Sequence, residues 1–255
     1  MCLIAFAWNA HPDYPLIVAA NRDEFHDRPT EAADWWQDQP GILAGRDLQA
    51  GGTWLAVSRA GRFATVTNYR EQSFTRIEHT SRGRLPIHFA TDEKVPQTYV
   101  DTIDGDDYAG FNLLVADFEN MSYASNRGDA EHLLGKGVYG LSNAALDTPW
   151  AKVERSKARL GSLIDRDAIS EDALFSILYD RTTSSEDVNA AHLAEEQARA
   201  ITAPFIVSET YGTRSSTLVL RHVSGRTDFH EKRFDRHGIE TGHSSYSFDA
   251  LAAVA

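Results

Sequence analysis

Hydrophobic and polar positions follow the pattern of β-strands near both ends of the chain. Residues 2–8 and 15–20 are apolar runs separated by a turn-rich stretch, which is typical of a β-hairpin. Three further pairs of strand-like runs follow: 53–58 with 62–67, 111–117 with 121–126, and 217–223 with 227–234. The sequence therefore predicts four β-hairpins.

Helical signals lie mainly in the middle of the chain. Four helices are predicted: over 84–92, from Pro149 onward, from Ser170 to Tyr179, and over 185–201. Thr148 or Asp147 is expected to cap the helix that starts at Pro149, because short polar side chains accept from the first helical N–H groups. Ser170 is expected to cap the next helix in the same way.

Hairpins at both ends with helices between them favour an α+β fold built on antiparallel sheets. Residues 25–50 contain Pro29, Pro40 and Gly41 and are predicted to be a loop. No linker, repeat or low-complexity tract interrupts the sequence, so residues 1–255 are predicted to form a single domain.

Composition and charge narrow the class of protein. The 255 residues are 42% hydrophobic and 24% charged, the balance of a globular protein with a buried core. A net charge of −12 argues against nucleic-acid partners and anionic membranes, which need clustered Lys and Arg. The sequence has no long apolar run, no secretory signal pattern and one cysteine, so a cytoplasmic protein without disulfides is expected.

The single cysteine is residue 2. Removal of Met1 would give Cys2 a free α-amine, whose pKa of about 7.7–8.0 suits a general base at neutral pH. A nucleophile activated by its own amine is an established route to acyl transfer. The alternative is that Cys2 is a small buried residue of an edge strand.

Asn21, Arg22, Asp23 and Glu24 follow directly on the apolar strand 15–20. Strand alternation places Asn21 and Asp23 on one face and Arg22 and Glu24 on the other. Such a set could orient an amine and neutralise a developing charge. An ion-paired junction between strand and loop is the alternative.

Three further polar residues are candidates for a site. Asn68 and Asn143 each follow a strand-like run, and an amide N–H at such a place can stabilise a tetrahedral oxyanion. Asn is equally common in turns. Arg214, after a glycine turn, could bind a carboxylate or phosphate of a substrate, or pair at the surface.

Other kinds of chemistry have no signal in the sequence. The ten histidines show no metal-binding spacing, and neither a nucleophile elbow nor a Gly-rich phosphate or dinucleotide loop occurs. No metal or cofactor is therefore expected.

Six segments in order resemble the NRDE family, whose eukaryotic members are called transport and Golgi organisation protein 2. They are MCLIAFAW, NRDE, AGRDLQAGGTWLAV, TNYRE, GLSNAALDTPWAKV and YGTRSSTLVL, and they span residues 2 to about 235. The resemblance implies an N-terminal-nucleophile hydrolase fold, a four-layer αββα sandwich of two antiparallel sheets.

The family is similar in outline to the choloylglycine hydrolases and penicillin V acylases, which cleave linear amides with an N-terminal cysteine. The resemblance implies that Cys2 is the nucleophile, that Asn143 contributes to the oxyanion hole, and that Asp23, beside Arg22, holds the amine. It further implies that Asn68 and Arg214 line the same pocket. Because the spacing from Arg to acid differs from that in the hydrolases, Asn21 or Glu24 remains an alternative to Asp23.

Two functions follow as hypotheses. The first is an N-terminal-cysteine hydrolase that cleaves a C–N bond of a small amide. The second is a non-catalytic protein of the same fold that binds or transports haem or an acyl lipid, because the eukaryotic relatives are associated with haem and lipid handling. A pure binding protein has no chemical need for Asp23, Asn68 and Asn143 together, which favours the hydrolase.

Overall fold

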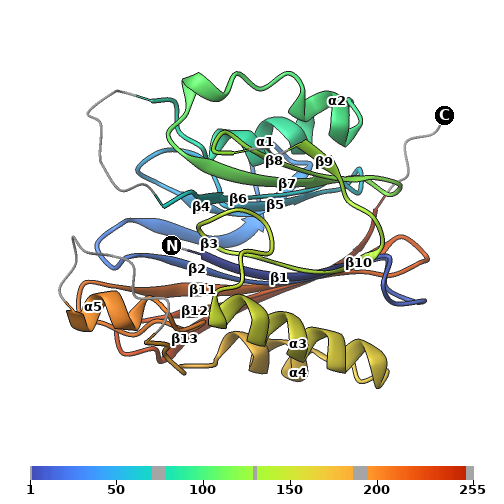
Figure 1. Cartoon of the computed structure of the whole chain (residues 1–255). Coiled ribbons are helices and arrows are strands. Elements are labelled where there is room, and N and C mark those ends of the chain that lie inside the picture. Colours follow the sequence, from blue (N-terminus) through green and yellow to red (C-terminus); the bar gives the residue numbers. More distant parts are fainter. Residues whose placement is uncertain (1, 71–78, 129–130, 186–194, 251–255) are drawn as a thin grey trace.

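Two antiparallel β-sheets stack face to face in the computed structural model, which describes residues 2–70, 79–128, 131–185 and 195–250 (Figure 1). The six-stranded sheet consists, in spatial order, of β10 (Gly137–Leu141), β1 (Cys2–Trp8), β2 (Leu16–Phe25), β11 (Tyr211–Arg221), β12 (Arg226–Phe234) and β13 (Glu240–Asp249). The seven-stranded sheet follows chain order: β3 (Thr30–Trp35), β4 (Ile42–Asp47), β5 (Leu55–Ser58), β6 (Phe63–Asn68), β7 (Phe111–Ala116), β8 (Met121–Ser125) and β9 (Glu131–Leu133).

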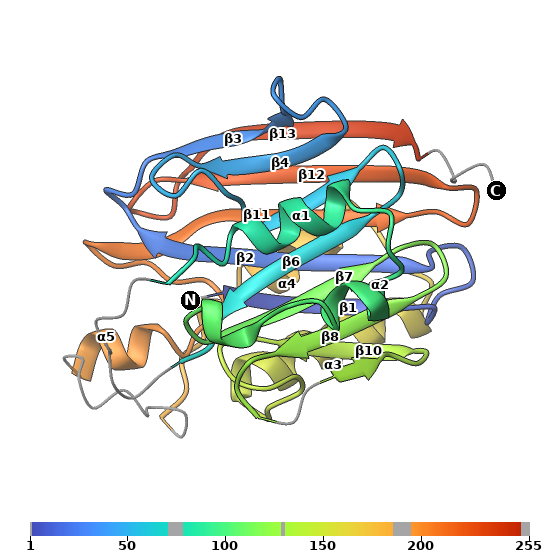
Figure 2. The same cartoon turned by 90° about the horizontal axis from the view of Figure 1, so that it is seen from above.

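Helices cover the outer face of each sheet, which completes the four-layer αββα sandwich that the resemblance implied (Figures 1 and 2). The seven-stranded sheet carries α1 (Arg84–Thr91), α2 (Pro96–Val100) and the short 3₁₀ turn η1 (Gly105–Asp107) on its side. The six-stranded sheet carries α3 (Ala151–Asp165) and α4 (Glu171–Leu178), and α5 (Glu195–Ala200) lies at the end where β1 begins. Within the described residues, no helix is both long enough and apolar enough to cross a bilayer.

In strand β1, large side chains lie on one face of the six-stranded sheet and small side chains lie on the other. Phe6 and Trp8 point between the two sheets, where they join the main core. Ala5 and Ala7 point the other way, into the cluster formed with the helical layer. The small residues allow α3 to lie close to the sheet, since large side chains there would hold the helix away.

The four predicted hairpins are confirmed as β1–β2, β5–β6, β7–β8 and β11–β12. Two of them turn at Gly61 and Gly225, whose φ angles of 71° and 90° favour glycine. The predicted hairpin over 2–20 extends further than expected, because β2 continues to Phe25 and takes in the whole NRDE tetrapeptide. The strand β13, which no pattern of apolar residues marked, is a polar edge strand.

The prediction of a loop over 25–50 is wrong, because β3 and β4 lie there. Only Ala33 of β3 is buried, and the pairing of β3 with β4 shifts register between Glu31 and Asp34. Such a strand lacks the alternation by which strands are recognised.

The predicted helices over 84–92 and from Ser170 are confirmed, and the Ser170 hydroxyl accepts from the Ala173 N–H as expected. Part of the helix predicted over 185–201 lies outside the described residues, and α5 forms its end. The predicted cap of α3 is wrong, since Trp150 occupies the N-cap position without a side-chain bond. Asp147 instead accepts from the Gly140 N–H, and the Thr148 hydroxyl donates to the Ala145 carbonyl.

We predict that the close packing of α3 against β10 requires glycine at position 140. A Cβ built there lies 2.5 Å from Val153 Cγ1 and 2.9 Å from Lys157 Cγ, so Gly140→Ala must push the helix outward. We expect a loss of about 1–3 kcal/mol in the free energy of unfolding, measured by urea denaturation. The matched control is Gly161→Ala within α3, where a Cβ meets nothing within 4 Å and should stabilise the helix slightly. Equal stabilities for the two variants would contradict this packing.

Candidate active site

The site is built around the first residue of β1. In the pairing of β1 with β2, Cys2 lies directly opposite Arg22, and both side chains have the same parity as the residues that face the second sheet. The Cys2 side chain is half-buried. Burial raises the pKa of the Cys2 thiol and the negative charge of Asp23 raises it further, whereas Arg22 lowers it.

Asn143 holds the nitrogen of Cys2. The Cys2 N–H donates to Asn143 Oδ1 at 3.1 Å, and the Ser142 hydroxyl donates to the Cys2 carbonyl at 2.7 Å. Both polar residues follow the end of β10 and are almost fully buried. The nitrogen that would become an α-amine if Met1 were removed is therefore positioned by a fixed amide oxygen.

The end of β6 ties the second sheet to the same place. Asn143 Nδ2 donates to the Asn68 carbonyl at 2.6 Å, and the Arg70 N–H donates to the Asn143 carbonyl at 2.7 Å. Thr67 Oγ1 donates to the Ser142 carbonyl at 2.7 Å. Asn68 thus enters the site through its backbone carbonyl, while the residue itself is exposed. These bonds fix the orientation of the Asn143 amide.

Asp23 is buried beside the thiol. Thr213 Oγ1 donates to Asp23 Oδ1 at 2.7 Å, and the Tyr211 hydroxyl donates to the Asp23 carbonyl at 2.7 Å. Burial raises the pKa of Asp23 to about 6, and Lys152 acts in the opposite direction. A hydrogen bond from the Asp23 backbone lowers the pKa of Cys2.

The other acids and amides of the tetrapeptide do not share this position. Asn21 Nδ2 donates to the Leu178 and Pro204 carbonyls, and its Oδ1 accepts from Ser216, so the side chain joins β2 to the helical layer. Glu24 is partly exposed, near Arg28. The contacts therefore place Asp23, rather than Asn21 or Glu24, beside Cys2.

Arg22 is positioned by an aromatic ring from the facing sheet. Its guanidinium carbon lies 4.2 Å from the centre of the Trp54 ring, and Nη1 donates to Thr30 Oγ1 at 3.2 Å. The Trp54 ring occupies the space beside Gly45, where a Cβ would lie 2.4 Å from it. Gly45 and Trp54 lie near opposite ends of the segment AGRDLQAGGTWLAV. Their contact brings the two ends of this segment together in space.

Arg214 lies at the bulge where the pairing of β11 with β2 shifts register. Its Nη1 donates to the Phe25 carbonyl at 2.7 Å and to the Arg28 carbonyl at 3.2 Å. The guanidinium thus braces the turn after β2, close enough to Arg22 to lower the pKa of that residue. A role in binding a substrate carboxylate or phosphate stays a prediction.

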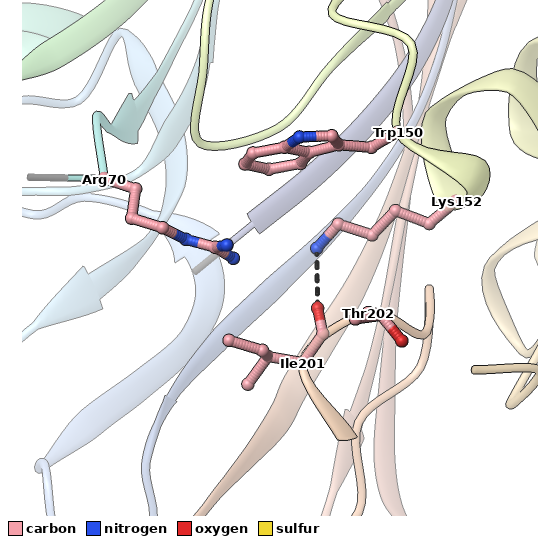
Figure 3. Close-up of a pocket in the computed structure, with 5 residues that line it drawn as sticks. All are labelled: Arg70, Trp150, Lys152, Ile201 and Thr202. Atoms are coloured by element: carbon pink, nitrogen blue, oxygen red, sulfur yellow. Dashed lines mark hydrogen bonds between the residues drawn. The ribbon is translucent and has the colours of Figure 1, made fainter. Parts of the chain in front are cut away.

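A shallow pocket beside these residues is lined by Arg70, Trp150, Lys152, Ile201 and Thr202 (Figure 3). The Lys152 side chain is buried, and its ammonium donates to the Ile201 carbonyl at 3.1 Å. The Arg70 guanidinium carbon lies 4.6 Å from the centre of the Trp150 ring. Two cations therefore line a pocket that is linked to Asn143 through Arg70 and to Asp23 through Lys152.

One possible metal-binding group occurs among the described residues, away from Cys2. Glu171, His230 and His243 bring their ligand atoms within 4.8 Å of one another under the start of α4. Separate elements supply the three residues, which explains why no spacing in the sequence indicated them.

The sequence singled out Cys2, Asp23 and Asn143, which the structure brings together, and it did not indicate the pocket. Arg70, Trp150 and Lys152 lie in two segments already quoted for the resemblance, TNYRE and GLSNAALDTPWAKV. Their presence in these segments is the signal by which the sequence could have indicated them. Without the fold, an Arg at the end of a strand and a Lys at the start of a helix resemble ordinary surface residues.

Comparison with solved structures supports the fold. Penicillin V acylase from Agrobacterium tumefaciens superposes with a TM-score of 0.53 at 11% identity, covering 99% of this chain and 92% of that one. A Caenorhabditis elegans ortholog of N-acylethanolamine-hydrolyzing acid amidase gives 0.52 at 10% identity, covering 86% and 92%. At these identities the likeness shows the N-terminal-nucleophile hydrolase fold alone.

Comparison of sequences identifies the family. The mouse Transport and Golgi organization 2 homolog is 35% identical over 258 residues, covering 91% of this chain and 92% of the relative. The human homolog is 34% identical over 256 residues with the same coverage, and the Drosophila melanogaster protein is 26% identical over 185 residues, covering 64% and 65%. The family model described as Transport and Golgi organisation 2 matches residues 1–236. The chain belongs to the Transport and Golgi organisation 2 family.

Proposed function

We propose that this protein is a hydrolase that cleaves the C–N bond of a small amide, with Cys2 as nucleophile after removal of Met1. The observation that carries the proposal is the placement of the Cys2 nitrogen on Asn143 Oδ1, beside a buried acid. A residue whose thiol and nitrogen are both held at a buried polar site has the arrangement that N-terminal nucleophiles require. The shared fold with named acylases and amidases supports the same reading.

The reaction proceeds through a thioester. The thiol proton moves to the Cys2 α-amine, and the thiolate attacks the amide carbon to form a C–S bond and an oxyanion. The second N–H of the Asn143 amide and a backbone N–H stabilise that oxyanion. The α-ammonium protonates the leaving nitrogen as the C–N bond breaks, and water then cleaves the thioester to release an acid and restore the thiol.

Asp23 and Arg22 adjust the charge around the nucleophile. The Asp23 carboxylate stabilises the α-ammonium formed after proton transfer, and the Arg22 guanidinium stabilises the thiolate. Because Cys2 would carry both a positive and a negative charge after proton transfer, the mechanism uses both the Asp23 carboxylate and the Arg22 guanidinium.

The placement of Asn143 and Asp23 at Cys2 favours hydrolysis of a small molecule over the binding of haem or an acyl lipid, because a protein that only binds has no chemical need for these groups. We place the enzyme in the cytoplasm, because a reduced Cys2 thiol is the reactive species.

The Cys2→Ala variant tests the reaction directly. In native protein whose intact mass shows loss of Met1, we expect release of amine from a panel of N-acyl amides. Cys2→Ala should lower that rate by about 10³-fold or more, because no thioester can form. Retention of Met1 in the native host, or equal activity of the variant, would overturn the proposal and leave the binding hypothesis in its place.

The pH dependence of activity should report Asp23. Because the mechanism needs the carboxylate, kcat/KM is expected to rise with pH through about 6 and to be about tenfold below its plateau at pH 5. Asp23→Asn should lower the plateau and remove this acidic limb. A limb of the same midpoint in the variant would assign the titration to another group.

Alkylation of the thiol tests the electrostatics without any substrate, since Cys2 is the sole cysteine of the chain. Asp23→Asn is expected to lower the thiol pKa and to speed modification by iodoacetamide at pH 7, followed by mass spectrometry. Arg22→Gln should raise the pKa and slow the reaction, whereas Arg22→Lys keeps the charge and should stay near wild type. The same direction of change in Asp23→Asn and Arg22→Gln would refute these assignments.

A further inference from the structure

Two histidines and a glutamate meet at the start of α4, on the face of the six-stranded sheet that carries the helices. Each offers one ligand atom, and these atoms all lie within 4.8 Å of one another. His230 Nδ1 lies 3.5 Å from Glu171 Oε2, and His243 Nε2 lies 3.5 Å from Glu171 Oε1. N–H···O hydrogen bonds are shorter, about 2.7–3.2 Å. The ligand atoms of a tetrahedral zinc ion, with bonds of about 2.0–2.1 Å, lie about 3.4 Å apart. The spacing therefore suits a shared cation better than direct hydrogen bonds.

Regular secondary structure holds all three side chains. The antiparallel pairing of β12 with β13 puts His243 opposite Lys232, two residues along from His230, so both imidazoles lie on one face. Phe229, next to His230 in β12, points into the core between the two sheets, which leaves the histidines on the helical side. Glu171 is the first residue of α4, a helix with a side-chain N-cap. Ligands placed on strands and at a helix start keep their geometry better than ligands on loops.

The surroundings of the cluster orient the imidazoles and leave one side open. The Phe175 ring, one turn after Glu171 in α4, meets the His243 ring edge-on, with 6.3 Å between the ring centres. Ser245 Oγ lies 3.1 Å from His230 Nδ1 and is a polar neighbour of the kind that orients metal ligands. Between 16% and 38% of each of the three ligand side chains is exposed. Water can therefore complete the coordination of an ion.

The charge around the cluster favours a cation, although Lys232 lies on the same face. The Lys232 ammonium is 3.7 Å from Glu240 Oε2, and it lies over the Phe175 ring, 4.6 Å from the ring centre. The carboxylates of Glu171 and Glu240 thus outnumber this one ammonium. A protein with a net charge of −12 also attracts cations over its surface as a whole.

We propose that Glu171, His230 and His243 bind a divalent first-row transition-metal ion, and that this ion is zinc. Two imidazoles, one carboxylate and water are a ligand set that zinc accepts, whereas Mg²⁺ and Ca²⁺ prefer oxygen ligands alone. The ion joins the start of α4 to the hairpin of β12 and β13. At the other end of α4, the Leu178 carbonyl accepts from Asn21 of β2. The ion thus steadies a helix that is bonded to the strand of the NRDE tetrapeptide.

Zinc titration of the full chain tests the site. The parent protein is untagged Cys2→Ala, because a thiolate is itself a zinc ligand and Cys2 is the sole cysteine. The protein is freed of metal with a chelator, and ZnCl₂ is added in an isothermal titration calorimeter. We expect one ion per chain. Zinc at 100 times its Kd should raise the melting temperature by about 5 °C, and MgCl₂ at the same concentration should leave it unchanged.

Two substitutions in the parent locate the ion, His243→Gln and Glu171→Gln. Each should weaken zinc binding by more than about tenfold, since loss of even an outer partner of a metal ligand costs about 10–100-fold in affinity. The control is His88→Gln, which removes an exposed histidine from α1, in the helical layer of the other sheet. This variant should bind zinc like the parent. Circular dichroism and the melting temperature of the metal-free proteins establish that all three variants fold.

Zinc binding that both substitutions weaken and His88→Gln leaves intact supports the site. A Kd weaker than about 0.1 mM in the parent, full binding in either His243→Gln or Glu171→Gln, or equal stabilisation by magnesium would overturn it. The result does not depend on the proposed hydrolase function, because the parent protein lacks the Cys2 thiol. Failure of one proposal therefore leaves the other standing.

Discussion

The register between β1 and β2 is the constraint on which the site depends. It pairs Cys2 with Arg22 and Leu3 with Asn21 over a ladder that reaches Trp8 and Leu16. A slip by one residue would turn every side chain of β1 to the opposite face. Phe6 and Trp8 would then point at α3, where the present structure holds only Ala5 and Ala7. Two unlike faces therefore fix the register, and the register fixes which way the thiol points.

Burial of the charged groups at the site costs solvation energy, and a neighbouring group of opposite charge offsets part of that cost. Arg22, Asp23 and Lys152 are all almost fully buried. Burial lowers the pKa of Arg22 and raises that of Asp23, so the low dielectric acts against the charged form of both. Apolar residues of similar size would pack such a position with less loss of solvation. The proposed reaction gives these charges a use that stability alone does not.

The elements that the sequence predicted well are those that bury one or both faces. The four hairpins have apolar alternation or continuous apolar runs, so their existence followed from local pattern. Strand β13 has no buried residue and β3 has only Ala33, so neither strand carries such a pattern. Asp147 and Thr148 have typical capping side chains, but contacts with β10 and Ala145 use both. The capping rule considers only the helix that follows, so it does not anticipate that residues preceding the helix take up these side chains.

The same limit applies to the site. Cys2 and Asp23 could be singled out because their chemistry is visible in isolation: an N-terminal thiol and an acid after a buried strand. The part played by Trp54 could not be predicted, since it depends on the absence of a side chain at Gly45 in another strand. Arg70 and Lys152 become a pair only when two sheets and a helix start converge. Their grouping is a property of the topology.

The bonds of Asn143 decide how its amide can act. Its Oδ1 accepts from the Cys2 nitrogen and its Nδ2 donates to the Asn68 carbonyl, so rotation of the amide by 180° would place like atoms together at both contacts. The orientation is therefore fixed from two sides. An amide nitrogen carries two hydrogens, and the Asn68 carbonyl takes one of them. In the proposed reaction, the same side chain would hold the Cys2 amine through its oxygen and face a substrate oxyanion through its second N–H. One residue would then align both partners of the first reaction step.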